Sequence, residues 1–365
     1  MKQPMILFRA VGGLAVCAAL AAFVSCENPY TNKGMFSEIS KEIKLTESNV
    51  KGNIFTVFAN EEFVFAGGGG IYYKPLNSGR KWDPFPTSGF TGGARARRLA
   101  LGADADGAEY LYALRMWQNE NYEDQFFADL YYCNINDVIA GRGAWKQIKD
   151  SKIIVANVSE SRINQYTVFS NNAAGAAKRK AYLATPDGVY ELDGATVKWE
   201  TNAAGAGTRS AVLIDSKTYF SSSLAACANA DNSKGWVIEG GAVKYWYGSA
   251  MQDSGVSVSN AVSLTYSAKD NCLYAGRGGS GSGAVRIDLD TEGKPTGTSE
   301  IGGNTDAAIG SYNVYALYCE QGANTLYAST IGRGSTFSSM YNGLWGRYDP
   351  ESSVDAQDKG NWNRE

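Results

Sequence analysis

The chain has 365 residues, a net charge of −3 and no histidine. The slightly acidic balance argues against general binding to nucleic acids or to anionic lipid surfaces. Because histidine is missing, the sequence excludes serine–histidine–aspartate and cysteine–histidine nucleophile systems and lacks the commonest ligand of zinc, copper and iron. We therefore expect no metal centre and no cofactor.

Residues 1–25 have the pattern of a secretory signal peptide. Lys2 and Arg9 precede an apolar run at 10–24, which is shorter than the roughly 20 apolar residues of a membrane span. The run ends on Phe-Val-Ser-Cys at 23–26, which resembles the lipobox of bacterial lipoproteins. Phe23 stands where leucine is usual, as in the relaxed lipoboxes of spirochaetes. The sequence predicts cleavage before Cys26 and lipidation of its thiol; an ordinary secretory signal is the alternative.

Residues 26–53 are polar and are interpreted as the lipidated N-terminus followed by a tether. Two or three acyl chains, such as palmitate, anchor a protein stably, whereas one chain gives only marginal binding. We therefore expect a protein of the bacterial cell envelope, held at a membrane by its lipid. The sequence leaves open whether it faces the periplasm or the cell surface.

From residue 54 to residue 365, short apolar and aromatic strands alternate with turns. Ala181–Gly194 is the clearest hairpin, because Thr-Pro-Asp-Gly at 185–188 predicts a tight turn. Related hairpins are expected at Phe63–Leu76, Tyr110–Ile135, Thr218–Gly240, Leu273–Asp290 and Leu326–Asp349. A further strand precedes most of the six hairpins, and a fourth follows several of them.

Units of four short strands predict an all-β fold, a β-propeller with six four-stranded blades, or seven as the alternative. One such blade cannot cover its own faces, so blades stack around an axis. Small residues recur at one position of the second strand, namely Ala66, Ala113, Ala184, Ala275 and Ala328. Residues 54–365 thus resemble the propellers of bacterial β-propeller lipoproteins. How the ring closes is left open.

Four cysteines lie in the predicted propeller: Cys133, Cys227, Cys272 and Cys319. They are widely spaced, so no C-x-x-C metal or redox motif exists. The envelope permits disulfides, and the sequence does not say how these four would pair. For Cys133 and Cys319, which lie in apolar strands, we expect buried free thiols.

Long connections between the second and third strands are the candidate binding loops. The propeller resemblance implies that they open on the face where ligands usually bind. They are expected at Met116–Ala128, Leu224–Lys234 and Gly332–Asn342. The aromatic candidates for ligand binding are Trp117, Tyr122, Phe337 and Tyr341.

Three arginines follow the second strands of their units: Arg115, Arg277 and Arg333. If they share one face, their guanidinium groups could bind a carboxylate, sulfate or phosphate. Alternatively each pairs with a nearby acid, for which Asp124, Asp288 and Asp349 are the candidates.

These observations favour a membrane-anchored, non-enzymatic scaffold or adhesin that binds an envelope or host protein and no nucleic acid. The alternative is a sialidase-like or other glycan-binding or glycan-hydrolysing propeller that uses the arginine cluster. Asn77–Trp82 resembles the Asp-box turn of sialidases, with Asn77 in place of aspartate, but no catalytic tyrosine and acid can be identified. The acidic stretch Ala103–Glu109 is expected to be a plain turn and not a calcium loop.

Overall fold

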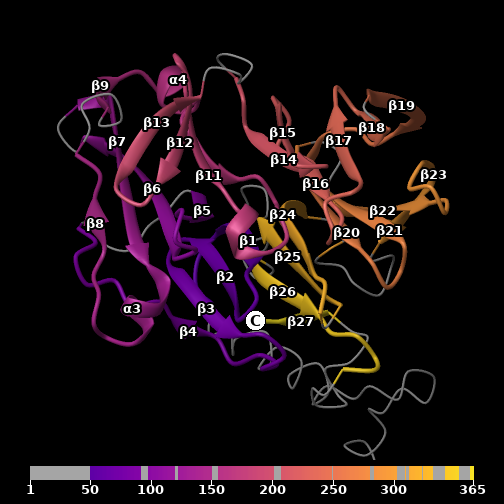
Figure 1. Ribbon diagram of the computed structural model, residues 1–365, viewed down its shortest axis with the longest axis horizontal. Helices are drawn as coiled ribbons and strands as arrows, with labels where there is room; N and C mark the ends of the chain where they lie inside the picture. Colours follow the sequence, from indigo (N-terminus) through magenta and orange to yellow (C-terminus); the bar gives the residue numbers. More distant parts are fainter. Residues whose placement is uncertain are drawn as a thin grey trace, which may run out of the picture. The chain divides into compact units, whose positions relative to one another are not determined.

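The computed structural model describes residues 50–91, 98–119, 122–149, 155–200, 207–248, 250–279, 283–301, 309, 312–322, 324–331, 342–352 and 362–365. These residues belong to one compact unit, Asn49–Glu365. It consists of antiparallel β-sheets, with the short helices α3 (Ile135–Ile139) and α4 (Glu160–Ile163) in connections (Figure 1). The predicted all-β fold is confirmed, and the repeated strand units agree with a propeller-like arrangement.

The first three sheets follow the predicted pattern, with their strands hydrogen-bonded in chain order. The first contains β1 (Ile54–Ala59), β2 (Phe63–Gly68), β3 (Ile71–Pro75) and β4 (Asp83–Pro84). The second contains β5 (Arg98–Ala103), β6 (Glu109–Asn119), β7 (Tyr122–Asn134) and β8 (Lys146–Gln147), with β9 (Val155–Val158) also on β7. The third contains β10 (Thr167–Ser170), β11 (Ala181–Thr185), β12 (Gly188–Asp193) and β13 (Thr196–Glu200).

The second half of the chain begins with a two-stranded sheet of β14 (Ser210–Ile214) and β15 (Lys217–Ser221). A four-stranded sheet follows, with β16 (Ala226–Ala228), β17 (Gly235–Glu239), β18 (Ala242–Tyr247) and β19 (Ala250–Ser257). The last two groups are β20 (Ala261–Ser267), β21 (Cys272–Arg277), β22 (Gly283–Leu289) and β23 (Pro295–Ile301), then β24 (Asn313–Glu320), β25 (Thr325–Ile331), β26 (Gly343–Arg347) and β27 (Trp362–Arg364). A single parallel pair, Gly283 with Asn313, links these two groups.

The Ala181–Gly194 hairpin forms as predicted from its turn residues. Thr185 Oγ1 accepts a hydrogen bond from the Asp187 N–H at 3.2 Å and donates one to the Gly188 carbonyl at 3.1 Å. Gly188 has a φ of 146°, and a Cβ there would lie 2.1 Å from the Trp199 ring. Glycine is therefore required at this position both for the backbone conformation and for the close approach of Trp199.

The predicted hairpin Thr218–Gly240 is wrong. β15 pairs back onto β14, and the segment expected to be a loop at Leu224–Lys234 contains β16, the first strand of the next sheet. Asp215 and Ser216, both with positive φ (46° and 68°), close β14 and β15 through a two-residue turn. The three residues Ala-Cys-Ala of β16 are too short a signal to be recognised as a strand.

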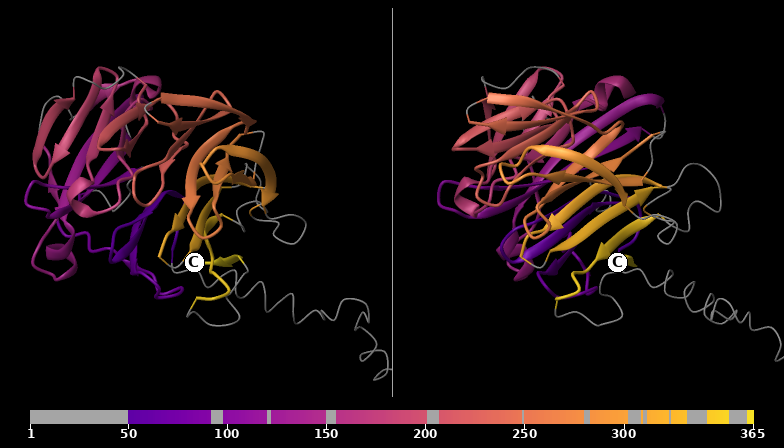
Figure 2. Two further views of the ribbon diagram at one scale, coloured as in Figure 1. Left: turned by 45° about the vertical axis from the view of Figure 1, so that its right-hand side comes forward. Right: turned by 90° about the vertical axis from the view of Figure 1, so that its right-hand side faces the viewer.

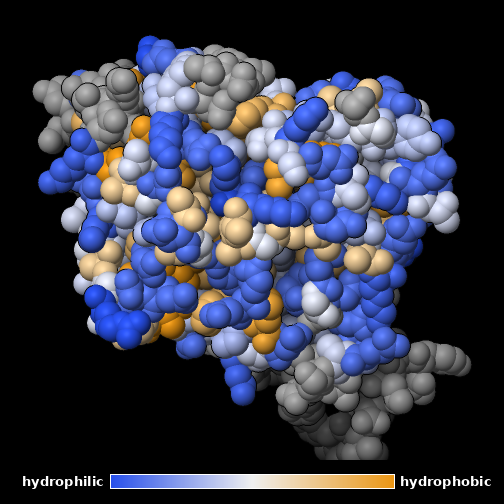
Figure 3. All heavy atoms as spheres, in the orientation of Figure 1, coloured by the Kyte–Doolittle hydropathy of each residue, from blue (hydrophilic) through white to orange (hydrophobic). Residues whose placement is uncertain are grey.

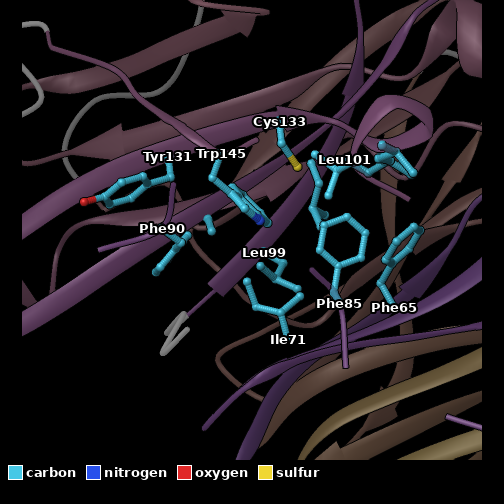
Figure 4. Close-up of a cluster of buried hydrophobic side chains, with 13 residues drawn as sticks. Phe65, Ile71, Phe85, Phe90, Leu99, Leu101, Tyr131, Cys133 and Trp145 are labelled. Carbon is cyan, nitrogen blue, oxygen red and sulfur yellow. The ribbon is translucent and has the colours of Figure 1, made fainter. Parts of the chain in front are cut away.

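The hydrophobic core consists of clusters between neighbouring sheets. Figure 4 shows one of them, in which Phe65 on β2 and Phe85, directly after β4, pack with residues of the second group of strands. These are Leu99 on β5, Tyr131 on β7 and Trp145, directly before β8. Other clusters join the later sheets in the same way. The five alanines noted at one strand position are all buried on second strands. Each sheet is therefore stabilised by burial against its neighbours and not alone.

The first and last sheets also share a cluster, which includes Val57, Trp82, Tyr327 and Leu344. Figures 1 and 2 both place the indigo strands β1–β3 beside the yellow strands β25–β27, and β1 contacts β24. Residues near the two ends of the described chain are thus packed against each other.

A buried ion pair lies within this junction. Lys74 on β3 and Glu365, which follows β27, are each 1% exposed, with Nζ 3.4 Å from Oε2. The Lys74 ammonium donates to the Tyr348 hydroxyl at 3.0 Å, and this hydroxyl donates to Glu365 Oε1 at 2.8 Å. The rings of Trp82, Tyr327 and Tyr348 surround the ammonium at 5.0, 4.8 and 5.1 Å. Burial lowers the Lys74 pKa, although the Glu365 carboxylate opposes this shift.

Replacing Glu365 by alanine should strongly destabilise the protein, because it leaves the Lys74 charge buried without its carboxylate partner. We expect a loss of about 3–5 kcal/mol in the free energy of unfolding, measured by urea denaturation. The control is Arg142→Gln, which removes an exposed ion pair with Asp137 and should change the free energy by less than about 0.5 kcal/mol. Equal midpoints for the two variants would contradict a stabilising role for the buried pair.

Candidate functional site

A cavity of about 430 Å³ runs along the first strands of the sheets. Most of its described lining comes from β1, β5, β10, β16, β20 and β24, with Ser210 at the start of β14, and the rest comes from connecting segments. It includes residues at both ends of these strands, such as Phe55 and Glu61 on either end of β1. The cavity is therefore enclosed by segments that are far apart in the sequence.

Hydroxyl side chains hold the first strands of neighbouring sheets together. A first strand lies at the edge of its sheet, so some of its backbone groups need partners outside the sheet. Ser170 Oγ accepts from the Leu101 N–H at 2.7 Å and donates to the Leu101 carbonyl at 2.8 Å. Thr265 Oγ1 accepts from the Cys319 N–H at 2.9 Å. These bonds fix the wall of the cavity.

The charged residues of the described lining are distributed unequally along the cavity. Arg98 begins β5 and Arg209 directly precedes β14, so both lie at the same end of the cavity. Glu61, Arg179 and Glu320 lie at or beyond the other end of these strands. One end of the described cavity is therefore basic, and the other carries both carboxylates of the lining.

Arg179 is neutralised at the acidic end of the cavity. Its guanidinium donates to Glu61 at 3.0 Å and forms a second ion pair with Glu109, which also accepts from Asn60 at 2.7 Å. Burial would raise the Glu61 pKa, but hydrogen bonding and the positive charge of Arg179 outweigh it and lower the pKa. This cluster joins the first three sheets and adds no net positive charge to its end of the cavity.

Met116–Ala128 is not the long loop predicted between the second and third strands of its unit. β6 and β7 continue as a hairpin to residues 119 and 122, and Trp117 faces Phe127 across it. The two rings stack with centroids 4.2 Å apart and planes at 10°. The aromatic residues of this segment, Trp117, Tyr122, Phe126 and Phe127, do not alternate with polar ones, so the sequence carried no period-two signal for a strand pair here. Tyr122 begins β7; its side chain lies outside the described atoms.

Arg115 and Trp117 meet on this hairpin. The Arg115 guanidinium lies 5.2 Å from the Trp117 ring centroid and 3.6 Å from the Asp129 carboxylate. Asp129 also accepts a hydrogen bond from the Trp117 indole N–H at 3.0 Å. Trp117 is nevertheless 37% exposed. Two of the predicted binding residues are thus brought together and are held in a fixed orientation.

Arg277, the second predicted arginine, is the last residue of β21 and forms a bidentate ion pair with Glu300 on β23. Its Nη1 donates to Glu300 Oε1 at 3.0 Å. Neither Arg277 nor Arg115 is among the residues that line the cavity. Of the acids expected to pair with the three arginines, Asp288 binds Arg286 and not Arg277. Asp349 binds Lys269, and the third predicted arginine, Arg333, lies outside the described residues.

Several predicted site residues lie outside the described residues, namely Cys26, Arg333, Phe337 and Tyr341, as does the side chain of Asp124. Sequence reasoning missed Arg98, Arg209, Phe55 and Tyr315, which line the cavity. Their only sequence signal was their position at the start of a first strand. That signal becomes visible once the four-strand register is known.

The described cysteines Cys133, Cys227, Cys272 and Cys319 are free and buried, as expected for Cys133 and Cys319. Cys227 and Cys319 also line the cavity. Burial raises the pKa of the Cys272 thiol to about 11 and that of Cys319 to about 12. These thiols are therefore neutral and weakly nucleophilic near neutral pH.

Metal-binding features are absent from the described part of the chain. No group of three or more acidic or cysteine side chains there is arranged to hold a metal ion. The acidic stretch Ala103–Glu109 contains a turn, in which Asp104 Oδ1 accepts from the backbone N–H groups of Asp106 and Ala108 at 3.0 and 2.9 Å. None of the described helices has the length and apolar character to cross a membrane.

No family model and no curated protein matches the sequence. Among solved structures, the extracellular domain assigned to a one-component system of Bacteroides thetaiotaomicron is 12% identical, with a TM-score of 0.46 over 79% of this chain and 41% of that one. A protein of unknown function from the same species is 11% identical, with a TM-score of 0.40 over 76% and 67%. A Bacteroides uniformis protein assigned as a 6-phosphogluconolactonase is 15% identical, with a TM-score of 0.39 over 84% of each chain.

The raised thiol pKa values predict slow alkylation of the folded protein. At pH 8, a pKa of about 11 leaves roughly one Cys272 thiol in a thousand ionised. Iodoacetamide should therefore label Cys133, Cys227, Cys272 and Cys319 far more slowly in buffer than in urea, as followed by mass spectrometry of the separate peptides. Labelling in buffer should accelerate as the pH rises. Any of the four thiols that reacts equally fast in both solutions would contradict its burial.

Proposed function

We propose that the protein is a lipoprotein of the bacterial cell envelope whose propeller binds a protein partner and catalyses no reaction. The observation that carries this proposal is the β6–β7 hairpin with its exposed aromatic pair. The lipid on Cys26 would hold the protein at the membrane, and residues 26–53 would separate the propeller from the surface.

The hairpin extends beyond the strand beside it. Arg98, the first residue of β5, pairs with Leu114 of β6, and this is the last residue pair between the two strands in this direction. Arg115–Asn119 continue past this point, a length of about 17 Å at the usual rise of a strand. We call this extended part of the β6–β7 hairpin the arm. β9 pairs with β7 on the side away from β6, with Val158 opposite Phe126 and Val155 opposite Ala128.

An aromatic pair on such an arm is suited to protein recognition. Tryptophan and arginine are common anchors of interfaces, and a side chain fixed before binding loses little entropy on binding. The Phe127 stack, the Asp129 hydrogen bond and the Arg115 contact fix Trp117 in this way. The face in Figure 3 is largely polar, with apolar residues in small separate groups, so a discrete anchor is needed for affinity.

We further infer that the sheets form a closed ring of seven members, in which β14 and β15 make a two-stranded blade. In support, the first strands contact one another in the order β1, β5, β10, β14, β16, β20 and β24, and β24 contacts β1. The contact between the β1 sheet and the β24 sheet would close the ring, with the Lys74–Glu365 pair at the seam.

The arrangement of arginines favours binding over glycoside hydrolysis. In a sialidase-like site, three guanidinium groups would be available to one substrate carboxylate. Here Arg115 and Arg277 each pair with a carboxylate of the protein itself, Asp129 and Glu300. Recruiting Arg115 for a substrate would leave the largely buried Asp129 without its partner, whereas Glu300 beside Arg277 is exposed.

Photo-crosslinking from the hairpin tests the partner proposal. With p-benzoylphenylalanine in place of Trp117, irradiation of intact cells should yield one discrete cross-linked species. The matched control is the same residue in place of Trp199, an exposed tryptophan on β13 in another sheet. Trp117→Ala should also lower the yield from the arm by about tenfold or more when the probe is moved to Gln118. The same product from positions 117 and 199, or none from 117, would refute the hairpin as the binding site.

Lipidation is tested with Cys26→Ser in the full-length chain. The unmodified protein should incorporate radioactive palmitate and sediment with membranes, whereas the variant should lose the label and move to the soluble fraction. Cys272→Ser is the control, since this thiol is buried and should not carry lipid. Palmitate incorporation by Cys26→Ser at the normal level would exclude Cys26 as the anchor.

A further inference from the structure

We propose that the central cavity is a second binding site, which takes a small oxyanion carried on a ring, such as an acidic sugar. The site is separate from the β6–β7 hairpin, and the proposal does not depend on the protein partner. The oxyanion is a carboxylate or a phosphate, since a guanidinium group binds either with paired hydrogen bonds.

Arg209 is the main oxyanion anchor. It precedes β14, is exposed, and lines the cavity. Among the residues that the structure describes, no carboxylate forms an ion pair with it, in contrast to Arg115, Arg179 and Arg277. Its backbone is fixed, because its N–H donates to the Ser221 carbonyl at 2.8 Å. The backbone that carries this guanidinium group is thus fixed at the cavity, and no carboxylate of the described chain pairs with the group.

Arg98 adds a second positive charge at the same end of the first strands. It is partly buried, and its Nη1 donates to the Phe55 carbonyl at 3.1 Å, which orients the guanidinium group. Both carboxylates of the described lining, Glu61 and Glu320, belong to the opposite end. This polarity attracts an anion to the arginine end and repels it from the other.

Two aromatic rings at the arginine end of the cavity can pack against the ring of the proposed ligand. Phe55 and Tyr315 lie edge to face, with centroids 6.3 Å apart, and both line the cavity and are partly exposed. An aromatic face packs well against the apolar face of a sugar or another ring. The volume of about 430 Å³ is near the lower end of the usual range of roughly 300–1,000 Å³ for small-molecule sites. It suits a ligand of one or two rings.

Isothermal titration calorimetry of the full-length chain in detergent tests this site. The probes are D-glucuronate, which carries a carboxylate, and glucose 6-phosphate, which carries a phosphate; D-glucose and acetate supply the ring and the anion alone. At least one acidic sugar should bind with a Kd below about 1 mM, about tenfold or more tightly than D-glucose and acetate. The tighter of the two acidic sugars identifies the oxyanion.

Variants locate the binding in the cavity. Arg209→Gln should weaken the acidic sugar by about tenfold or more, and Arg209→Lys by less, because lysine keeps the charge but not the paired donors. Arg142→Gln, which removes an exposed arginine outside the cavity, and Trp117→Ala on the hairpin should leave the Kd unchanged. The proposal is overturned if neither acidic sugar binds more tightly than D-glucose, or if Arg209→Gln binds as well as the unaltered protein.

Discussion

The buried contact between Lys74 and Glu365 is the interaction on which the arrangement of the sheets depends most directly. It connects β3 with the residue that follows β27, and the rings of Trp82, Tyr327 and Tyr348 surround the ammonium. A stacked series of sheets leaves its two end faces uncovered unless the ends meet. Here the β1–β4 and β24–β27 sheets cover each other, and a charge pair removed from water gives the contact a defined geometry.

The cavity follows from the same arrangement. Because each first strand lies at the edge of its sheet, its backbone would face an open space with unpaired groups, and serine and threonine hydroxyls from neighbouring first strands satisfy part of them. These serine and threonine side chains lie between neighbouring first strands and keep them apart, which leaves room along the strand edges. The scaffold therefore holds the cavity in one shape, whereas the β6–β7 arm projects from a single sheet. The cavity and the β6–β7 hairpin therefore belong to different parts of the scaffold, since none of the residues Arg115, Trp117 and Phe127 lines the cavity.

Much of the fold could be read from the sequence, because its signals are local. The Thr-Pro-Asp-Gly turn at 185–188 and the short apolar and aromatic runs of β1, β5 and β24 predicted strands that the structure contains. The error at β16 arose because three small residues carry no periodicity, so the register of the fourth unit was assigned to the wrong strand. Met116–Ala128 was misread as a long loop, because its aromatic residues are irregularly spaced and give no period-two pattern, although the segment forms a hairpin.

The candidate site was harder to predict, because its residues converge only through the stacking of distant sheets. Arg98 and Arg209 are separated by two whole sheets in the sequence and share one cavity. Ion pairs are also invisible without the cross-strand register: Arg115 lies opposite Asp129, and Arg277 meets Glu300 two strands away. Trp117, in contrast, could be recognised as a candidate because a tryptophan in a polar stretch stands out without any knowledge of its partners.

The two-stranded β14–β15 sheet has a consequence for the cooperativity of folding. An isolated hairpin is marginally stable in water. This one packs Ala211 and Phe220 against the third sheet, and Val212, Ile214 and Tyr219 against the β16–β19 sheet. Its stability is therefore derived from both neighbours at once. If either neighbouring sheet unfolds, the β14–β15 hairpin loses part of its buried contacts, and the sheet on its other side then loses its contacts with the hairpin. This two-stranded sheet therefore couples the unfolding of the two halves of the chain, so that they do not unfold separately.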